Sequence, residues 1–386
     1  MRPLPPAGLA QAVRGADPRA FAMVMATGIV SVALRQAGSP VLSSALLWVA
    51  SAAFVVLAAA SVWRAAGFPR DVRADLTRSD RVFGYFAVAA AASVLAARLS
   101  GRGQREVVTV LAVFTALAWA GACCAAIAFL TARTGTRRAI TDVNGTWQLW
   151  VVGTQSVAIA ATSAYAAGVV PDRLAAWAGL VAWCAGAALY LLVTALVIAR
   201  LLTVGLAPGD PFGPYWVTMG AASITVLAAA QILHVTGPAV LAVSRPALTG
   251  LALAFWSVAS ALIPALTVIG TARWLRGQAA KGFRRELWMI VFPAGMYATA
   301  SMRIGAEAGL PLIREVGTAA VWVAAAVWMG VFAWMTAWPV TRRRSARLYS
   351  LTDTTEPAFS REDSGLREDP GGCSAPNPPG NPDPPG

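Results

Sequence analysis

Hydroxyl-bearing residues and glycines recur at similar positions in alternate apolar segments of this sequence. Hydroxyls and polarised backbone hold a small ion weakly enough for it to leave again, as conduction through a pore requires. We therefore predict that such residues line a pore, and the candidates are Thr27, Gly28, Ser31, Gly84, Gly153, Thr154, Gly220, Ser223 and Gly295. The alternative is that small residues at these positions only let neighbouring helices pack closely.

The acidic residues indicate the sign of the ion. No Asp or Glu lies well inside an apolar segment, and the nearest are Glu106 and Glu286 at segment starts and Glu307 near an outer end. A cation pathway or a proton relay normally uses carboxylates within the membrane. The pattern therefore favours anions over cations.

Three arginines fall near the outer ends of alternate apolar segments, namely Arg35, Arg98 and Arg303. Together they predict a positive outer vestibule that raises the local concentration of anions. The alternative is that each arginine is an interfacial anchor whose charge reaches the headgroups. Arg303 would then pair with Glu307, four residues further along the same helix.

The Phe292–Pro293 pair lies inside an apolar segment and has a mechanical consequence. Proline removes a helix hydrogen bond and clashes with the preceding turn, so a helix should kink there. In a helix that borders a pore, the kink could push the ring of Phe292 across the axis, where it blocks ions by steric closure and dewetting. The alternative is a kinked helix whose phenylalanine packs into a neighbour.

The sequence argues against an enzyme. His234 is the single histidine and has no partner at the spacing of metal ligands. The four cysteines show no metal spacing or disulfide framework; they are Cys123, Cys124, Cys184 and Cys373. No nucleotide-binding loop is present either. We therefore expect no catalytic residue, no metal and no cofactor.

The composition requires a membrane. Of 386 residues, 57% are hydrophobic and 13% charged, and the mean hydropathy is +0.61; a soluble domain keeps about a quarter of its residues charged. The apolar runs reach about 20 residues, enough for a helix to cross the hydrocarbon core. The predicted all-α fold has about ten spans, at 20–37, 41–63, 81–99, 106–131, 147–168, 174–202, 213–236, 247–272, 286–308 and 316–338.

The net charge of +13 does not predict a nucleic-acid partner, because the arginines sit between the apolar runs and set topology. The basic residues concentrate in connections that share a side with both termini. We therefore expect a plasma-membrane protein with cytoplasmic N- and C-termini, a cytoplasmic segment 1–19, a membrane domain 20–338, and a tail 339–386 that is basic, then rich in Pro and Gly, and disordered. We see no cleavable signal peptide.

The spans form a repeat. The odd-numbered spans begin near 20, 81, 147, 213 and 286, and short outer connections join each to the next, which predicts five tandem helical hairpins. Small residues mark the odd spans, so we predict that these form an inner ring around a central pore. The even spans carry most of the tryptophans, including Trp119, Trp183, Trp256 and Trp328, which suit contacts with lipid or another subunit.

Four strings resemble the tellurite-resistance/dicarboxylate transporter family, which includes the plant guard-cell slow anion channels: FAMVMATGIVSVAL in the first span, NGTWQLWVVGTQSVAIA in the fifth, PYWVTMGAASITVLA in the seventh and WMIVFPAGMYATA in the ninth. The resemblance covers roughly residues 18 to 338. It implies a homotrimer with a separate anion pore through each subunit. It also implies that a phenylalanine on the ninth helix plugs the pore, and the motif places it at Phe292.

These observations favour a passive anion channel for small anions, embedded in a lipid bilayer and without a nucleic-acid partner. The alternative within transport is a proton-coupled carrier for C4-dicarboxylates or sulfite. The absence of carboxylates within the spans counts against proton coupling.

Overall fold

The computed structural model describes residues 7–133, 138–208, 210–278 and 285–352, and all regular structure in this part of the chain is helical. The longer helices are α2 Phe21–Gln36, α3 Pro40–Gly67, α6 Phe86–Leu99, α7 Arg105–Thr131, α9 Gln148–Ala166, α10 Asp172–Thr203, α11 Trp216–Leu233, α12 Ala239–Leu275, α13 Trp288–Glu307 and α14 Pro311–Thr352. The shorter ones are α1 Ala7–Arg14, α4 Pro69–Leu76, α5 Ser79–Val82 and α8 Arg138–Thr141.

Eight helical segments of the described chain are long and apolar enough to cross a membrane. The predicted spans 147–168 and 286–308 are helical, as α9 and α13, but they are not among the eight. Both are polar for their length: α9 contains Gln148, Thr154 and Gln155, and α13 ends with Arg303 and Glu307. The protein is therefore a multi-pass membrane protein, and the count of ten spans stays a prediction.

Two helices differ from their predicted bounds. The eighth predicted span, 247–272, is the middle of α12, which begins at Ala239 and continues through Pro246 and Pro264. The last predicted span ended at 338, whereas α14 continues to Thr352, so residues 339–352 are helical where disorder was expected. Residues from 353 on lie outside the described part of the chain. The structure divides into residues 1–338, which hold the bundle, and residues 339–386.

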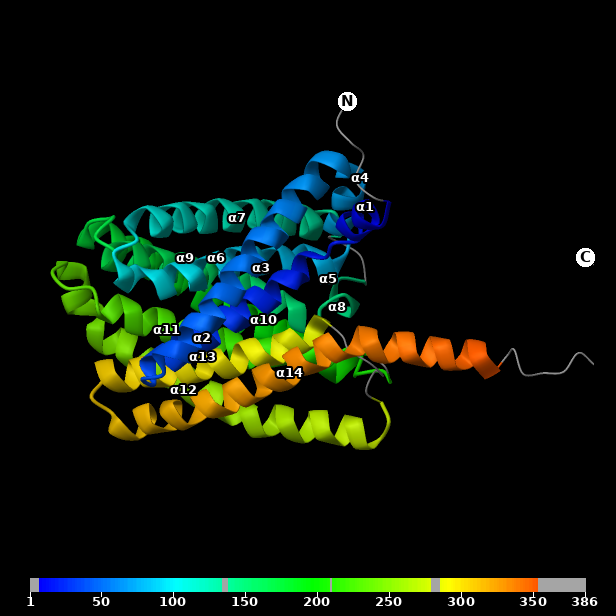
Figure 1. The fold of residues 1–386 in the computed structure, drawn as a ribbon. Helices are drawn as coiled ribbons and strands as arrows, with labels where there is room; N and C mark the ends of the chain where they lie inside the picture. The colour runs from blue at the N-terminus through cyan, green and yellow to red at the C-terminus, as the bar shows by residue number, and fades with distance from the viewer. Residues whose placement is uncertain (1–6, 134–137, 209, 279–284, 353–386) are drawn as a thin grey trace, which may run out of the picture. The chain divides into compact units, whose positions relative to one another are not determined.

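Five helices pack in a closed ring. Helix α2 contacts α6 and α13, α9 contacts α6 and α11, and α11 contacts α13 (Figure 1). Helices α3, α7, α10 and α12 pack against the outside of this ring, on α2, α6, α9 and α11 respectively. The inner helices are buried along almost their whole length, as in α11, where nearly every residue from Val217 to Leu233 is inaccessible. The outer helices expose large apolar side chains instead.

A 3₁₀ turn precedes each helix of the ring. The five turns are η1 Pro18–Ala20, η2 Phe83–Tyr85, η4 Gly145–Trp147, η5 Gly213–Tyr215 and η6 Arg285–Leu287. They contact one another in the order η1, η2, η4, η5, η6 and back to η1. We call them the turn ring. All five inner helices therefore start at the same end of the bundle, which we call the inner end.

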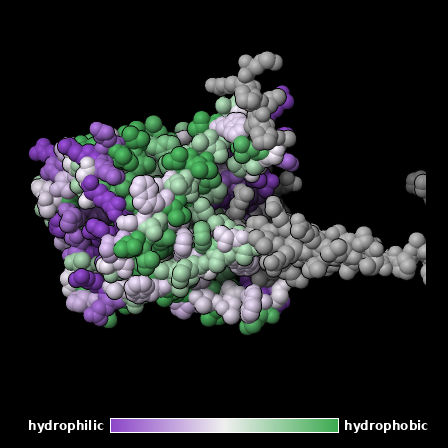
Figure 2. Space-filling model, in the orientation of Figure 1, coloured by the Kyte–Doolittle hydropathy of each residue, from purple (hydrophilic) through white to green (hydrophobic). Residues whose placement is uncertain are grey.

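The surface agrees with burial in a bilayer. Figure 2 shows hydrophobic residues across the middle of the visible face and hydrophilic residues gathered at the end where α13 is followed by α14. That end, opposite the turn ring, is the outer end. Large apolar side chains on the outer helices are exposed, among them Trp48, Val243 and Leu202. An apolar surface of this kind is stable in lipid and costly in water.

Candidate functional site

Phe292 lies within the ring of inner helices and is fully buried. Its ring packs against Gly220 of α11: a Cβ built on Gly220 would lie 3.1 Å from Phe292 Cε1 and 2.9 Å from Pro293 Cγ. Helix α13 continues through Pro293 without ending. The structure therefore places the predicted gate on an inner helix, in a space that exists because residue 220 has no side chain.

The other candidate glycines also provide room at contacts between neighbouring inner elements. A Cβ on Gly153 of α9 would lie 2.6 Å from the ring of Phe86 on α6, and one on Gly28 would lie 2.8 Å from Val94. Gly295 meets Ile29 and Val30 of α2 in the same way, and Gly84 meets Arg19 of η1. These glycines set the diameter of the ring by letting its helices approach closely. Whether they also line a pore stays a prediction.

The candidate hydroxyls are hydrogen-bonded. Ser223 donates to the carbonyl of Met219 at 2.9 Å and Thr154 to that of Trp150 at 2.9 Å. Thr154 also accepts a bond from the indole of Trp119 on α7 at 3.1 Å, and Thr27 accepts one from Trp328 on α14 at 3.0 Å. The oxygen atoms of Thr27 and Thr154 therefore join an outer helix to an inner one.

The tryptophans of the outer helices were expected to face lipid or another subunit, and four of them correct that expectation. The indole N–H of Trp183 donates to the carbonyl of Thr225 on α11 at 2.9 Å, and that of Trp256 donates to Ser301 on α13 at 2.8 Å. With Trp119 and Trp328, each of these indoles crosses from an outer helix to an inner helix. The reason is that a buried indole N–H needs an acceptor, and inner-helix hydroxyls and carbonyls supply one.

Replacing Trp328 with phenylalanine should lower the stability of the protein by about 1 kcal/mol, the usual net value of a hydrogen bond. The change removes the bond to Thr27 but keeps an aromatic ring in contact with Phe332. Thermal unfolding in detergent would measure it. Trp322→Phe on the same helix is the control, because Trp322 is 53% exposed; equal destabilisation by both variants would contradict the role of the indole bond.

Arg98 is the most unusual charged residue of the candidate vestibule. It is only 5% exposed, and within the described chain no carboxylate lies at ion-pair distance from it. Its guanidinium donates instead to two hydroxyls, Ser31 at 3.2 Å and Ser43 at 2.7 Å. Ser31 and Ser43 each donate to the other's carbonyl at 2.6 Å, so their oxygen lone pairs are available to Arg98. A positive charge without a countercharge is thus held at the outer end of α6.

Of the other two vestibule candidates, Arg35 lies close enough to Arg98 for the two positive charges to repel each other. Arg35 and Arg303 are exposed at the ends of α2 and α13. The expected pair between Arg303 and Glu307 is not formed in the described structure. Glu307 lies 3.0 Å from Nδ1 of His234 instead, a contact that joins the outer ends of α11 and α13. The reason is that the end of α11 brings His234 to Glu307, a neighbour that helix spacing alone does not reveal.

At the inner end, a cavity of about 420 Å³ lies against the turn ring. Its lining includes residues contributed by all five repeats, for example Arg19, Asp80, Thr146, Tyr215 and Glu286. These residues surround the inner opening of the ring, where all five inner helices start; we call this opening the mouth.

Arg19 links three carboxylates at this mouth. It contacts Asp17 at 2.6 Å, Asp80 at 3.3 Å and Glu286 at 3.5 Å. Burial opposes ionisation of Asp17, but the hydrogen bonds and charge of Arg19 outweigh it, so the pKa of Asp17 lies below its usual value. Asp17 is therefore charged at neutral pH, and the cluster holds the first two turns and the last turn together.

Three carboxylates of the inner end were not predicted, although they share a signal in the sequence. Asp80, Asp142 and Asp210 each precede a turn of the turn ring by three residues, before Phe83, Gly145 and Gly213. Phe86 was missed as well, although its position directly after a turn is shared by the aromatic residues Phe21, Trp216 and Trp288. The three carboxylates and Phe86 could have been found because each type of residue recurs at a fixed distance from the turns.

Comparison with known proteins agrees with this arrangement. A 136-residue part of the chain is 38% identical to uncharacterized membrane proteins of Mycobacterium tuberculosis from strains H37Rv and CDC 1551, covering 35% of this chain and 69% of each relative. The model of the family described as voltage-dependent anion channel matches residues 16–336, which include the whole ring of inner helices. The match confirms the resemblance drawn from the four sequence strings. The chain belongs to the voltage-dependent anion channel family.

Proposed function

We propose that the protein is a passive channel for small anions, with a pore along the axis of the ring formed by α2, α6, α9, α11 and α13 and a gate at Phe292. The observation that carries the proposal is the closed ring itself, with a buried aromatic side chain between its members. The small anion is the substrate and the bilayer is the surrounding medium.

The charges of the inner helices support an anion. Their residues include three arginines, Arg35, Arg98 and Arg303, and one carboxylate, Glu307, which is the last residue of α13. Arg98 adds an uncompensated positive charge at the outer end. At the inner end, five helices begin at the turn ring, so their partial positive charges act on the cavity there. An anion that enters from the outer end therefore meets the positive charge of Arg98 before it meets Phe292. At the inner end the arginines of the cavity stand beside carboxylates, so the helix starts are the feature that favours an anion there.

We further propose that all ten long helices cross the membrane as five hairpins, with both termini in the cytoplasm and the turn ring at the cytoplasmic face of the plasma membrane. The basic connections on the side of the termini support this orientation. The family resemblance suggests a homotrimer in which each subunit has its own pore, and the exposed apolar side chains of the outer helices offer surface for such contacts.

Ionic current through the purified protein in a planar bilayer, under a chloride or nitrate gradient, tests the proposal. An anion-selective reversal potential supports a channel. Uptake of labelled malate or sulfite driven by a proton gradient, without current in wild type or gate variants, would favour the proton-coupled carrier instead.

Replacing Arg98 with glutamine should reduce anion current about threefold or more at low salt, and less at high salt, because screening weakens long-range attraction. The matched control is Arg102→Gln, since Arg102 is exposed at the same end and bonds Ser44. Current measured over a range of salt concentrations separates the two variants. An equal loss in both, or a loss independent of salt, would contradict a specific role for the buried charge.

A further inference from the structure

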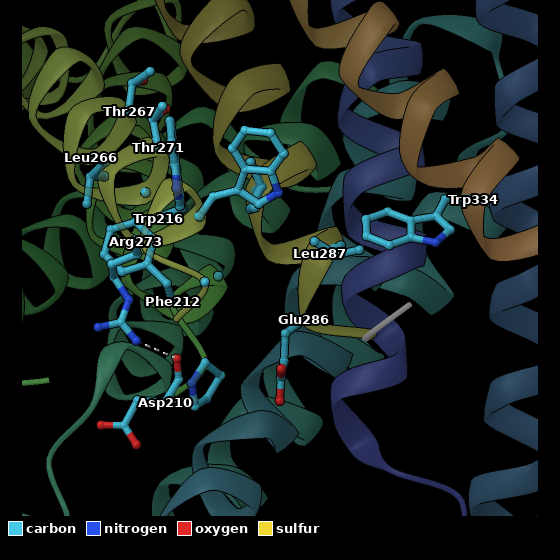
Figure 3. Close-up of a pocket in the computed structure, with 16 residues that line it drawn as sticks. Asp210, Phe212, Trp216, Leu266, Thr267, Thr271, Arg273, Glu286, Leu287 and Trp334 are labelled. Carbon is cyan, nitrogen blue, oxygen red and sulfur yellow. Dashed lines mark hydrogen bonds between the residues drawn. The ribbon is translucent and has the colours of Figure 1, made fainter. Parts of the chain in front are cut away.

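A second cavity, of about 720 Å³, lies outside the ring of inner helices and is lined by residues near the end of α12 and by Trp334 of α14 (Figure 3). Its walls include Leu266 and Thr267 of α12, Trp216 of α11, Ile290 of α13 and Trp334 of α14. Phe292 does not line it. The cavity therefore lies beside the ring rather than within it, although Asp210 and Glu286 border both this cavity and the one at the turn ring. Two of its walls are outer helices that face the bilayer.

The inner end of this cavity is charged. Arg273, 8% exposed, donates to the carbonyls of Ala207 at 3.0 Å and Asp210 at 3.2 Å (Figure 3). In the described structure no carboxylate lies within ion-pair distance of Arg273. The carboxylates of Asp210 and Glu286 also line the cavity, and they lie 3.7 Å from Arg200 and 3.5 Å from Arg19. One end of the cavity thus offers a positive and a negative site side by side.

The rest of the lining is mostly apolar and aromatic. Trp216, Leu266, Ile290 and Trp334 form walls suited to a hydrocarbon chain. Trp274, the residue after Arg273, also lines the cavity and is 68% exposed; tryptophans are frequent at the level of lipid headgroups. A ligand matched to this cavity has an apolar chain and a headgroup with both signs of charge.

We propose that this cavity binds one phospholipid of the inner leaflet with a zwitterionic ammonium headgroup, such as phosphatidylethanolamine. The phosphate would be bound by Arg273, which suits a phosphate geometrically and electrostatically. The ammonium group would lie toward Asp210 and Glu286, and an acyl chain would lie along the apolar walls. An anionic lipid such as phosphatidylglycerol has no ammonium group to place near these two carboxylates, so it should bind more weakly.

Native mass spectrometry of the full-length protein in detergent, titrated with phosphatidylethanolamine or phosphatidylglycerol of the same acyl chains, tests the proposal. Wild type should retain one phosphatidylethanolamine per chain and prefer it about tenfold over phosphatidylglycerol. Thr267→Trp places an indole in the cavity from an exposed position of α12 and should abolish retention. Val268→Trp, on the exposed neighbouring position outside the cavity lining, should leave it unchanged.

Asp210→Asn removes one of the two negative charges and should bring the binding of the two lipids close to equal. Equal binding of both lipids by wild type, or unchanged retention in Thr267→Trp, would overturn the proposal. A change of subunit number in Thr267→Trp, with no lipid bound to wild type, would assign the cavity to a contact between copies of the chain. The measurement involves no transport, so its outcome is independent of the proposed anion channel.

Discussion

Phe292→Ala is expected to raise the anion current at least about tenfold, because the variant removes the largest side chain proposed to lie across the pore. In the present structure the Phe292 ring is fully buried against Gly220. An alanine at position 292 is too short to fill the space beside Gly220, so water and ions can enter that space. Single-channel or macroscopic current in planar bilayers under a chloride gradient measures the change.

The control for this variant is Phe21→Ala. Phe21 is as deeply buried as Phe292 but contacts Phe54 of the outer helix α3, with 5.9 Å between ring centroids. Both variants delete a buried ring and should destabilise the protein by about 3–5 kcal/mol. Only Phe292→Ala should increase the current. An increase in both would attribute the effect to loosened packing, and an increase in neither would make Phe292 a packing residue.

Gly145→Ala is expected to prevent the inner helices from closing into a ring. A Cβ on Gly145 would lie 2.5 Å from the backbone nitrogen of Tyr215 and closer still to the carbonyl of Pro214. These are backbone atoms of η5, so no side chain can rotate away and the two turns must separate. We expect a loss of folded protein of about tenfold or more, measured as the monodisperse fraction on size-exclusion chromatography after solubilisation, since overpacking costs about 1–3 kcal/mol even where side chains can adjust.

The matched control is Gly121→Ala in the middle of α7, where nothing lies within 4 Å of the added Cβ. Alanine is the better helix former, so this variant should be as stable as wild type or more stable. Normal yield of Gly145→Ala would show that the contact between η4 and η5 is not required for the fold. Reduced yield in both variants would indicate a general intolerance of larger residues.

Much of the architecture could be predicted from the sequence. Apolar runs located most of the long helices, because such a run of about 20 residues has few other stable states. Helices α9 and α13 were predicted too, although both are too polar to be among the eight segments able to cross a membrane. The ends were less certain: α12 begins at Ala239 rather than 247, since the polar residues Ser244 and Arg245 and the proline Pro246 weaken the signal there. Small residues on alternate spans indicated which helices lie inside, because only small side chains let five helices approach one another.

The chain by itself thus determined that this protein resides in a membrane, that alternate helices differ in character, and that acidic residues avoid the interior of the inner helices. The tertiary structure decided the partners. Thr27 of α2 and Trp328 of α14 are 301 residues apart in the sequence but form a hydrogen bond. Glu307 contacts His234 rather than Arg303. Helical periodicity predicts which face of a helix a residue occupies. The residue that it contacts on a neighbouring helix depends on how all the helices pack, and this packing is fixed only when the ring closes.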